Sequence, residues 1–249
     1  IINILEKDGK INKNGIKSYI GLDRFEARKK IINELKSLNV LEKVESIINK
    51  VPYGDRSNTI IEPLLTEQWF VDAKSLSKKP IQTVKRKQTT FFPENWTKTF
   101  HQWMNNIEPW CISRQIWWGH RIPVWYGQDG KIFAAESEKD AKKLAKAYYK
   151  NKNYNLVQET DVLDTWFSSA LWPFTTLGWP EKKNMIKKFY PTSVLVTGFD
   201  IIFFWVARML MMGNYFLKET PFKKVYVHAL VRDEKGQKMS KSKGNVIDP

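Results

Sequence analysis

Residues 193–200 read SVLVTGFD, and this stretch decides the fold class that we predict for the chain. Residues 193–197 favour a strand, and the glycine at position 198 lets a ligand approach the backbone closely. The apolar residues 201–212 predict a buried helix. A strand, a glycine turn and a helix with Asp200 near its start form half of a nucleotide-binding α/β unit. Asp200 would either accept hydrogen bonds from ribose hydroxyls or cap the helix.

A second predicted strand, residues 224–231, leads into a basic segment. Residues 232–237 are typical of a polar turn, and residues 238–245 read KMSKSKGN. Ammonium groups in such a loop can offset the oxyanion charge that grows during phosphoryl or nucleotidyl transfer. For an arbitrary basic run, a solvated lysine cluster or a localisation signal is the alternative.

This basic segment resembles a signature of one enzyme family. Residues 238–242 spell the KMSKS motif of class I aminoacyl-tRNA synthetases, and residues 233–249 resemble the form found in the valyl, isoleucyl and leucyl members. The resemblance implies ATP-dependent activation of an amino acid, with Mg²⁺ accompanying ATP as substrate. It assigns Lys238 and Lys241 to the triphosphate and to the transition state that releases pyrophosphate. The ATP-binding residues that it implies are Gly198, Asp200, His228, Met239, Ser240 and Ser242.

A further motif resembles the valyl members specifically. Residues 164–169 read DTWFSS, and residues 177–180 read LGWP. Trp166 by itself would be an ordinary core aromatic residue. By the resemblance it lines a pocket for valine with Ile201 and Trp205, which share a helix face because they are four residues apart. The implied partners are therefore valine, ATP and tRNA(Val).

The composition is that of a folded, basic protein. The 249 residues are 42% hydrophobic and 14% aromatic, which indicates a packed core, and the net charge of +15 indicates a polyanionic partner. Charge alone does not choose between nucleic acid, nucleotide and anionic membrane. From the resemblance we expect tRNA, with no DNA or membrane partner, and a cytoplasmic location. A lone cysteine, Cys111, excludes an internal disulfide and a cysteine-built metal site, so we predict no structural zinc and no metal-binding residues.

The resemblance also divides the chain. We expect an α/β fold in which residues 1–88 are the C-terminal part of a mixed α/β editing insertion, the site that removes mischarged threonine. Residues 89–125 would return to the catalytic domain, residues 126–158 would be a small surface insertion, and residues 159–249 would be the second half of a Rossmann-type catalytic domain. We expect an internal fragment, inactive by itself, because the histidine pair of the family's other ATP signature is not found in it. The alternative is a non-catalytic, basic RNA-binding module on the same scaffold.

The helices outside these motifs follow from periodicity and capping. Residues 24–38 predict a helix with an apolar face, which Asp23 and Glu26 would cap. Residues 73–87 predict a helix broken by Pro80, and residues 138–150 a surface helix. Residues 93–104 carry three aromatic side chains at helical spacing, which we interpret as a core face in preference to a base-stacking surface. The apolar residues 201–212 are too short to span a bilayer.

Overall fold

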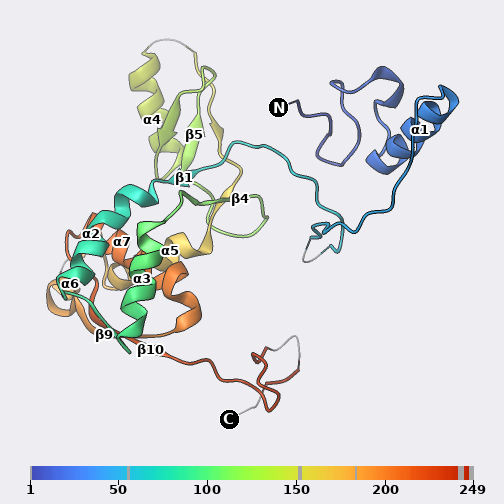
Figure 1. Cartoon of the computed structure of the whole chain (residues 1–249). Helices are drawn as coiled ribbons and strands as arrows, with labels where there is room; N and C mark the ends of the chain where they lie inside the picture. Colours follow the sequence, from blue (N-terminus) through green and yellow to red (C-terminus); the bar gives the residue numbers. More distant parts are fainter. Residues whose placement is uncertain (1, 55–56, 151–152, 183, 241–243, 247–249) are drawn as a thin grey trace. The chain divides into compact units, whose positions relative to one another are not determined.

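A three-stranded parallel sheet organises the larger part of the molecule (Figure 1). Its strands are β2 (Thr90–Phe92), β9 (Thr192–Gly198) and β10 (Phe222–His228), in the order β2-β10-β9. The computed structural model describes residues 2–54, 57–150, 153–182, 184–240 and 244–246. The sheet belongs to a unit that spans Gln68–Pro249, and Ile1–Glu67 form a second unit. The predicted α/β class with a parallel sheet is thus confirmed.

The β9–helix–β10 crossover is the unit predicted around residues 193–200. The two strands pair in register, from Phe222 opposite Thr192 to His228 opposite Gly198. The helix between them starts as a 3₁₀ turn (Phe199–Ile201), continues as a π-helical turn (Ile202–Val206) and becomes α7 (Ala207–Phe216). The predicted helix is therefore present, but its first turns are irregular and it continues beyond residue 212.

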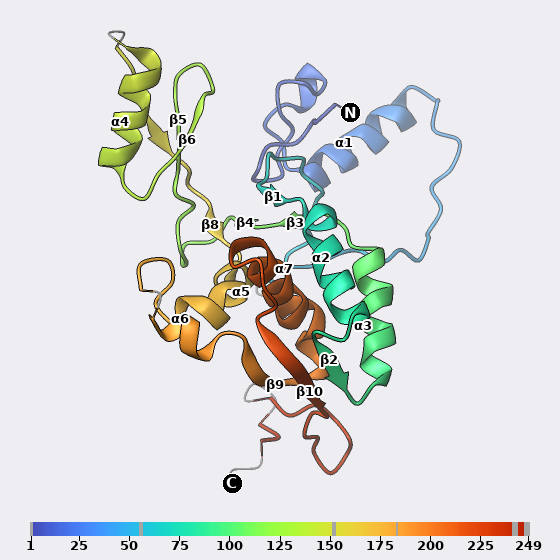
Figure 2. The same cartoon turned by 90° about the vertical axis from the view of Figure 1, so that its left-hand side faces the viewer.

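Helices on both sides of α7 complete the core (Figure 2). Helix α5 (Thr165–Thr175) packs on one side, and α2 (Ala73–Lys85) and α3 (Asn95–Asn105) lie on the other; α6 (Asn184–Phe189) precedes β9. On α3, Trp96 stacks on Phe199 and Trp103 stacks on Phe203, with ring centroids 5.7 and 4.9 Å apart. Phe100 on the same face is fully buried. The aromatic residues of α3 are therefore core residues, as predicted.

Helix α2 continues through Pro80, so the predicted break is wrong. Asp72 caps the helix by accepting a hydrogen bond from the amide of Ser75 at 3.0 Å. Pro80 is fully buried, and α2 packs against α7. A proline inside a helix removes one backbone hydrogen bond. In α2 the burial of one helix face outweighs that loss, which local sequence rules do not include.

The helical stretch Phe199–Phe216 has 18 residues, and its length and composition would allow it to cross a membrane. Length therefore does not exclude a bilayer span, contrary to the sequence-based argument. Half of this stretch is buried inside the protein, and Met209 and Leu210 are among its fully buried side chains. A core helix passes the same test of length and composition, and the burial identifies Phe199–Phe216 as one.

Short antiparallel strands connect this core to a small peripheral sheet. The strands are β1 (Phe70–Val71), β3 (Trp110–Cys111), β4 (Ser113–Arg114), β5 (Val124–Tyr126), β6 (Ile132–Ala134), β7 (Val157–Gln158) and β8 (Val162–Leu163). They form the pairs β1-β3 and β4-β8 and the sheet β6-β5-β7, on which α4 (Glu138–Tyr149) packs. The predicted helix over residues 138–150 is confirmed.

Glu159 joins the peripheral sheet to the core. Its Oε2 atom accepts hydrogen bonds from Tyr126 Oη at 2.6 Å and Trp69 Nε1 at 2.9 Å. Burial raises the pKa of this carboxyl, but these hydrogen bonds and those from the backbone of Thr160 and Asp161 outweigh burial and lower the pKa to about 2. The carboxylate is therefore ionised over the whole physiological range.

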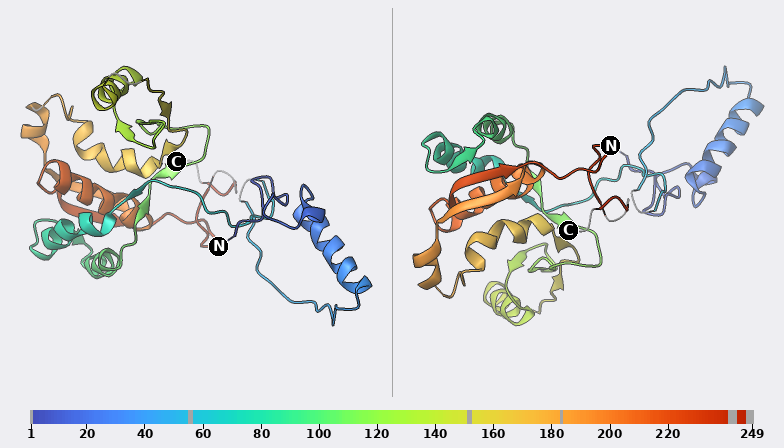
Figure 3. Two further views of the ribbon diagram at one scale, coloured as in Figure 1. Left: turned by 90° about the horizontal axis from the view of Figure 1, so that it is seen from above. Right: turned by 90° about the horizontal axis from the view of Figure 1, so that it is seen from below.

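One face of the parallel sheet is not covered by the helices that the structure describes (Figure 3). Val194, Val196 and Tyr226 point to this face and are about half exposed, whereas Leu195 and Val225, which alternate with them, are buried. Parallel sheets usually have both faces covered. The larger unit thus has an apolar surface of a kind that proteins normally bury.

The smaller unit has helix α1 (Arg24–Ser37) and a short 3₁₀ turn, Lys17–Tyr19. Asp23 caps α1 as predicted, through a 2.8 Å hydrogen bond from the amide of Phe25. Ala27 is the buried residue of this helix, so its predicted apolar face is largely exposed within the unit. The larger unit begins at Gln68, and residues 68–88, which we expected in the insertion, are packed with it.

Candidate active site

The candidate site begins at the carboxyl ends of β9 and β10. Gly198 and His228 are the last residues of these strands, and the sheet register places them opposite one another. Asp200 follows two residues after Gly198, in the 3₁₀ turn. In open parallel α/β sheets, ligands bind in the crevice outside the carboxyl ends of the strands. The three residues predicted to hold adenosine therefore lie together at the edge where this fold binds ligands.

Gly198 is needed because the space around it is already filled. A Cβ atom at this position would lie 2.8 Å from Asp200 Oδ1, 3.3 Å from a methyl carbon of Leu230 and 3.7 Å from His228 Cε1. The backbone of Gly198 has an ordinary extended conformation, so its role is to allow close approach and not to adopt an unusual φ. The same distances show that Asp200 and His228 both border this glycine.

Lys238 reaches this edge from the basic segment. Its Nζ atom lies 3.0 Å from Asp200 Oδ2. The two side chains are 64% and 33% exposed, so the ion pair is solvated and contributes little to stability. Both groups can therefore exchange this contact for a ligand. The ion pair shows directly that the first lysine of the KMSKS motif can reach the ribose-binding position.

A hydrogen-bonded turn holds Lys238 in place. Asp233 Oδ1 accepts hydrogen bonds from the amides of Lys235 at 3.0 Å and Gln237 at 2.7 Å. Asn245 donates to Asp233 Oδ2 at 2.7 Å and accepts from the amide of Ser240 at 2.9 Å. Asp233 and Asn245 thus brace the basic segment from both sides. Sequence reasoning predicted the turn but did not identify these two residues as its supports.

The remaining predicted ATP-binding residues are only partly described. Met239 and Ser240 follow Lys238 and are half-buried. Lys241 and Ser242 lie outside the described residues. His228 Nδ1 is 2.8 Å from the carbonyl oxygen of Ala229, and because a carbonyl only accepts, Nδ1 carries the hydrogen in the neutral ring. His228 Nε2 is then the nitrogen that can accept a hydrogen bond from a ligand.

The predicted valine residues lie where α5 meets the π-helical turn. Trp205 Nε1 donates to the carbonyl oxygen of Ser169 at 3.0 Å, and the Trp205 ring lies 6.0 Å from that of Trp172. Trp166 stacks on Phe204 at 5.7 Å and not on Trp205. Ile201 is the last residue of the 3₁₀ turn and is half-buried. Trp205 is thus fixed at both its ring and its nitrogen, and π-helical turns are frequent at functional sites.

A buried acidic cluster beneath this wall was not predicted. Asp164 is 5% exposed and caps α5, and its Oδ2 atom lies 3.2 Å from Arg208 and 3.3 Å from Arg114. The same oxygen accepts a 2.9 Å hydrogen bond from Trp110 Nε1. The Arg208 guanidinium also lies 3.9 Å from the centroid of the Trp110 ring. Burial lowers the pKa of Arg208, and the charge of Asp164 opposes that shift.

The contacts of Asp164 join the start of α5 to α7 and to the strand segment at Trp110. The only sequence signal for them was the DTWFSS motif itself, because Arg114 and Arg208 are far from Asp164 in the chain. Among the described residues, no group of three or more histidine, cysteine, aspartate and glutamate side chains could hold a metal ion.

The comparisons with known proteins assign the class of protein that this site and fold define. Residues 7–249 match the family model of tRNA synthetases class I (I, L, M and V), so the chain belongs to that family. Two solved structures of Mycobacterium tuberculosis methionyl-tRNA synthetase, each with methionyl-adenylate, have TM-scores of 0.52 and 0.51. Each match covers 82% of this chain and 34% of the other, at 17% and 16% identity, and thus supports the fold.

Within the family, the most similar sequences are named for one amino acid. The chain is 70% identical to a valine–tRNA ligase of Pelagibacter ubique over 249 residues, all of this chain and 28% of that protein. It is 57% identical to a valine–tRNA ligase of Caulobacter vibrioides, over 27% of that protein's length. The chain thus spans a little more than a quarter of the curated relatives that it matches.

Proposed function

We propose that this chain is part of a valine–tRNA ligase, an enzyme that activates valine with ATP and transfers it to tRNA(Val). The observation that carries the proposal is the ion pair between Lys238 and Asp200, because it joins the KMSKS segment to the carboxyl ends of β9 and β10. The 70% identity to a valine–tRNA ligase supports the choice of amino acid. As a translation enzyme, the protein would act in the cytoplasm.

In the first step, a carboxylate oxygen of valine attacks the α-phosphorus of ATP. The bond between the α-phosphorus and the bridging oxygen breaks, and pyrophosphate leaves with the bonding electrons. Lys238 and Lys241 would offset the negative charge that grows on the leaving group. Asp200 would accept hydrogen bonds from the ribose once ATP draws Lys238 away from it. Mg²⁺ would enter with ATP as part of the substrate.

The other proposed contacts position the two substrates. Gly198 lets adenosine approach the end of β9, and His228 and Met239 would border the adenine. Ser240 and Ser242 would donate hydrogen bonds from the loop. Trp166, Ile201 and Trp205 would surround the side chain of valine, and the hydrogen bond of Trp205 to Ser169 would keep that wall rigid.

A rigid apolar pocket leaves one error uncorrected. Threonine has nearly the shape of valine, and an apolar pocket does not strongly reject an isostere that adds a hydroxyl group. Such an enzyme needs a second, hydrolytic site. We assign residues 1–88 to the C-terminal part of that editing insertion, on the strength of the family resemblance.

The test compares two lysines of the same turn in a protein with the full length of the curated relatives. Lys238→Ala should slow valine-dependent exchange of pyrophosphate into ATP by about 100-fold or more, because losing one transition-state contact costs about 2.7–4 kcal/mol in comparable sites. Lys235→Ala is the matched control: it removes an exposed lysine three residues away and should change the exchange rate less than about twofold. Equal effects of the two substitutions would refute the role of Lys238 in catalysis.

A further inference from the structure

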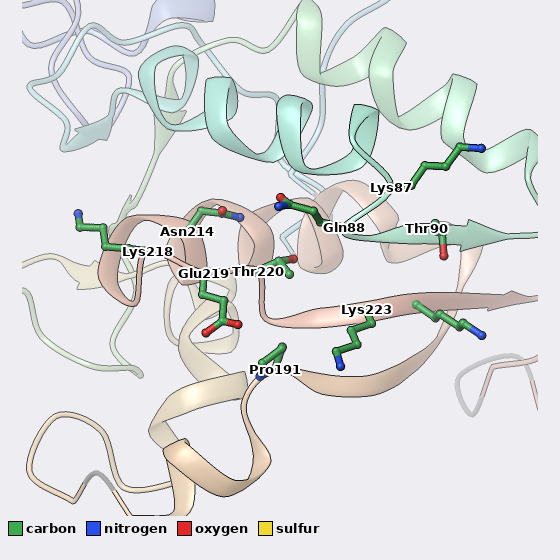
Figure 4. A pocket seen from close by; sticks show the side chains of 10 residues that line it. Lys87, Gln88, Thr90, Pro191, Asn214, Lys218, Glu219, Thr220 and Lys223 are labelled. Atoms are coloured by element: carbon green, nitrogen blue, oxygen red, sulfur yellow. The ribbon is translucent and has the colours of Figure 1, made fainter.

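A second polar cavity lies at the opposite edge of the parallel sheet. Its volume is about 550 Å³, and it is formed by the amino ends of β2, β9 and β10 and by the end of α7 (Figure 4). The proposed ATP site lies at the carboxyl ends of the same strands. The cavity is therefore separate from the site described above, and its volume is within the range of roughly 300–1,000 Å³ typical of ligand sites.

The charge of this cavity is strongly positive. Lys87, Lys218, Lys223 and Lys224 line it, and Glu219 is the acidic side chain among its lining residues. In the part of the chain that the structure describes, none of these five side chains is within ion-pair distance of an opposite charge. Four cations and one anion thus share a small volume without neutralising one another, and this arrangement favours an anionic ligand.

Helix ends explain only part of this charge. Lys87 follows the end of α2 and Lys218 follows the end of α7, where a cation offsets the partial negative charge of a helix C-terminus. Both residues have a positive φ, 59° and 61°, at a position where glycine is the usual residue. Lys223 and Lys224 lie at the start of β10, so no helix end accounts for them.

The lining also limits the chemistry of the ligand. No aromatic side chain is among the described residues of the cavity wall, so a nucleobase would have no ring to stack on. The buried Asn214 is already used, because it donates to the carbonyl oxygen of Leu210 at 2.9 Å and accepts from Thr83 at 3.4 Å. Thr220 is hydrogen-bonded to Thr89 at 2.6 Å. The lysine ammonium groups therefore remain as the principal donors.

We propose that this cavity at the amino ends of β2, β9 and β10 binds phosphate groups through Lys87, Lys218, Lys223 and Lys224, without recognising a base. The phosphate could come from a free phosphoanion such as pyrophosphate or from the backbone of an RNA, and the two sources share the chemistry that the lysines recognise. The site is independent of the function proposed above, because its residues lie at the other edge of the sheet.

The test uses the 249-residue chain and follows its backbone amides by NMR during titration with pyrophosphate at constant ionic strength. Saturable shifts are expected at Thr90, Lys218 and Lys223, and they should persist in a Lys238→Gln variant. Lys223→Gln combined with Lys224→Gln should weaken this binding about tenfold, the effect of losing charge-assisted hydrogen bonds. Glu219→Gln should strengthen it, because a repelling charge is removed.

A matched control removes the same charge elsewhere. Lys139→Gln combined with Lys146→Gln changes two exposed lysines of α4 and should leave pyrophosphate binding within about twofold. A single-stranded RNA decamer is the second probe: shifts at the same amides with RNA, and none with pyrophosphate, would identify the RNA backbone as the source of the phosphate. The proposal is overturned if neither probe shifts these amides, or if the control variant loses as much affinity as the cavity variant.

Discussion

Replacing Asp164 tests how the wall of the proposed valine pocket is held together. Its carboxylate is 5% exposed and faces Arg208, Arg114 and Trp110 Nε1 at distances of 3.2, 3.3 and 2.9 Å. Asp164→Asn keeps an oxygen that can cap α5 and accept from Trp110, but it removes the charge. Asp164→Ala removes the charge, the cap and the acceptor together. Comparing the two substitutions therefore separates the ion pairs from the hydrogen bonds.

The expected cost follows from these contacts. Removing one partner of a fully buried ion pair costs about 3–5 kcal/mol, and we expect about 2 kcal/mol for Asp164→Asn because Arg114 is 40% exposed and can turn to solvent. Losing the cap costs about 1 kcal/mol more, and losing the hydrogen bond to a charged acceptor costs about 1.5 kcal/mol. Asp164→Ala should therefore lower the free energy of unfolding by about 4 kcal/mol, since such terms are not fully additive.

Urea unfolding followed by tryptophan fluorescence measures this cost in the correct unit. All 11 tryptophans lie after residue 67, so the signal reports on the larger unit alone. In an Arg208→Met background, the cost of Asp164→Asn should fall to about half, because the charge that it orphans is gone. Asp140→Asn, at an exposed pair on α4, is the control and should cost less than about 0.5 kcal/mol. Equal losses for Asp164→Asn and Asp140→Asn would refute the reasoning.

Three more predictions concern the site and its junction with the peripheral sheet. Gly198→Ala should weaken ATP binding in the full-length protein with little change in valine affinity, because the new Cβ would lie 2.8 Å from Asp200 Oδ1; isothermal titration with each substrate checks this. Trp205→Ala should let larger amino acids enter the activation step while hydrolysis of mischarged threonine persists; unchanged selectivity in pyrophosphate exchange would remove Trp205 from the pocket. Glu159 has a folded pKa of about 2, below its unfolded value, so its stabilisation is present above about pH 4.5 and is lost as the pH falls towards 2. Glu159→Gln should therefore flatten the decline of the melting temperature in this acid range.

The features that local sequence determines were predicted well. The strand, glycine turn and helix around Gly198 are encoded by neighbouring residues, as are the caps at Asp23 and the turn that ends in Lys238. These patterns were sufficient to place the proposed ATP site at the carboxyl ends of β9 and β10. The continuous helix through Pro80 was missed because its stability comes from packing against α7, which no local rule contains.

The features that depend on distant residues were not predicted. Asp164 meets Arg208 across 44 residues, and the cavity lysines come from three separate elements. The π-helical turn Ile202–Val206 has the composition of an ordinary apolar helix, and its irregularity follows from how Phe203, Phe204 and Trp205 pack against α3 and α5. Lys241 and Ser242 lie outside the described residues, so their assignment to ATP stays a prediction.

The position of β2 in the sheet has a consequence for synthesis on the ribosome. Thr89, at the start of β2, is joined to Thr220, just before β10, by a 2.6 Å hydrogen bond across 131 residues. Strand β2 pairs with β10, so it has no partner strand until β10 has been made. At translation rates of about 5–20 residues per second, this delay lasts roughly 7 to 26 seconds. Throughout that interval the apolar faces of α2 and α3 await α7, and the nascent chain depends on chaperones or on slow elongation to remain soluble.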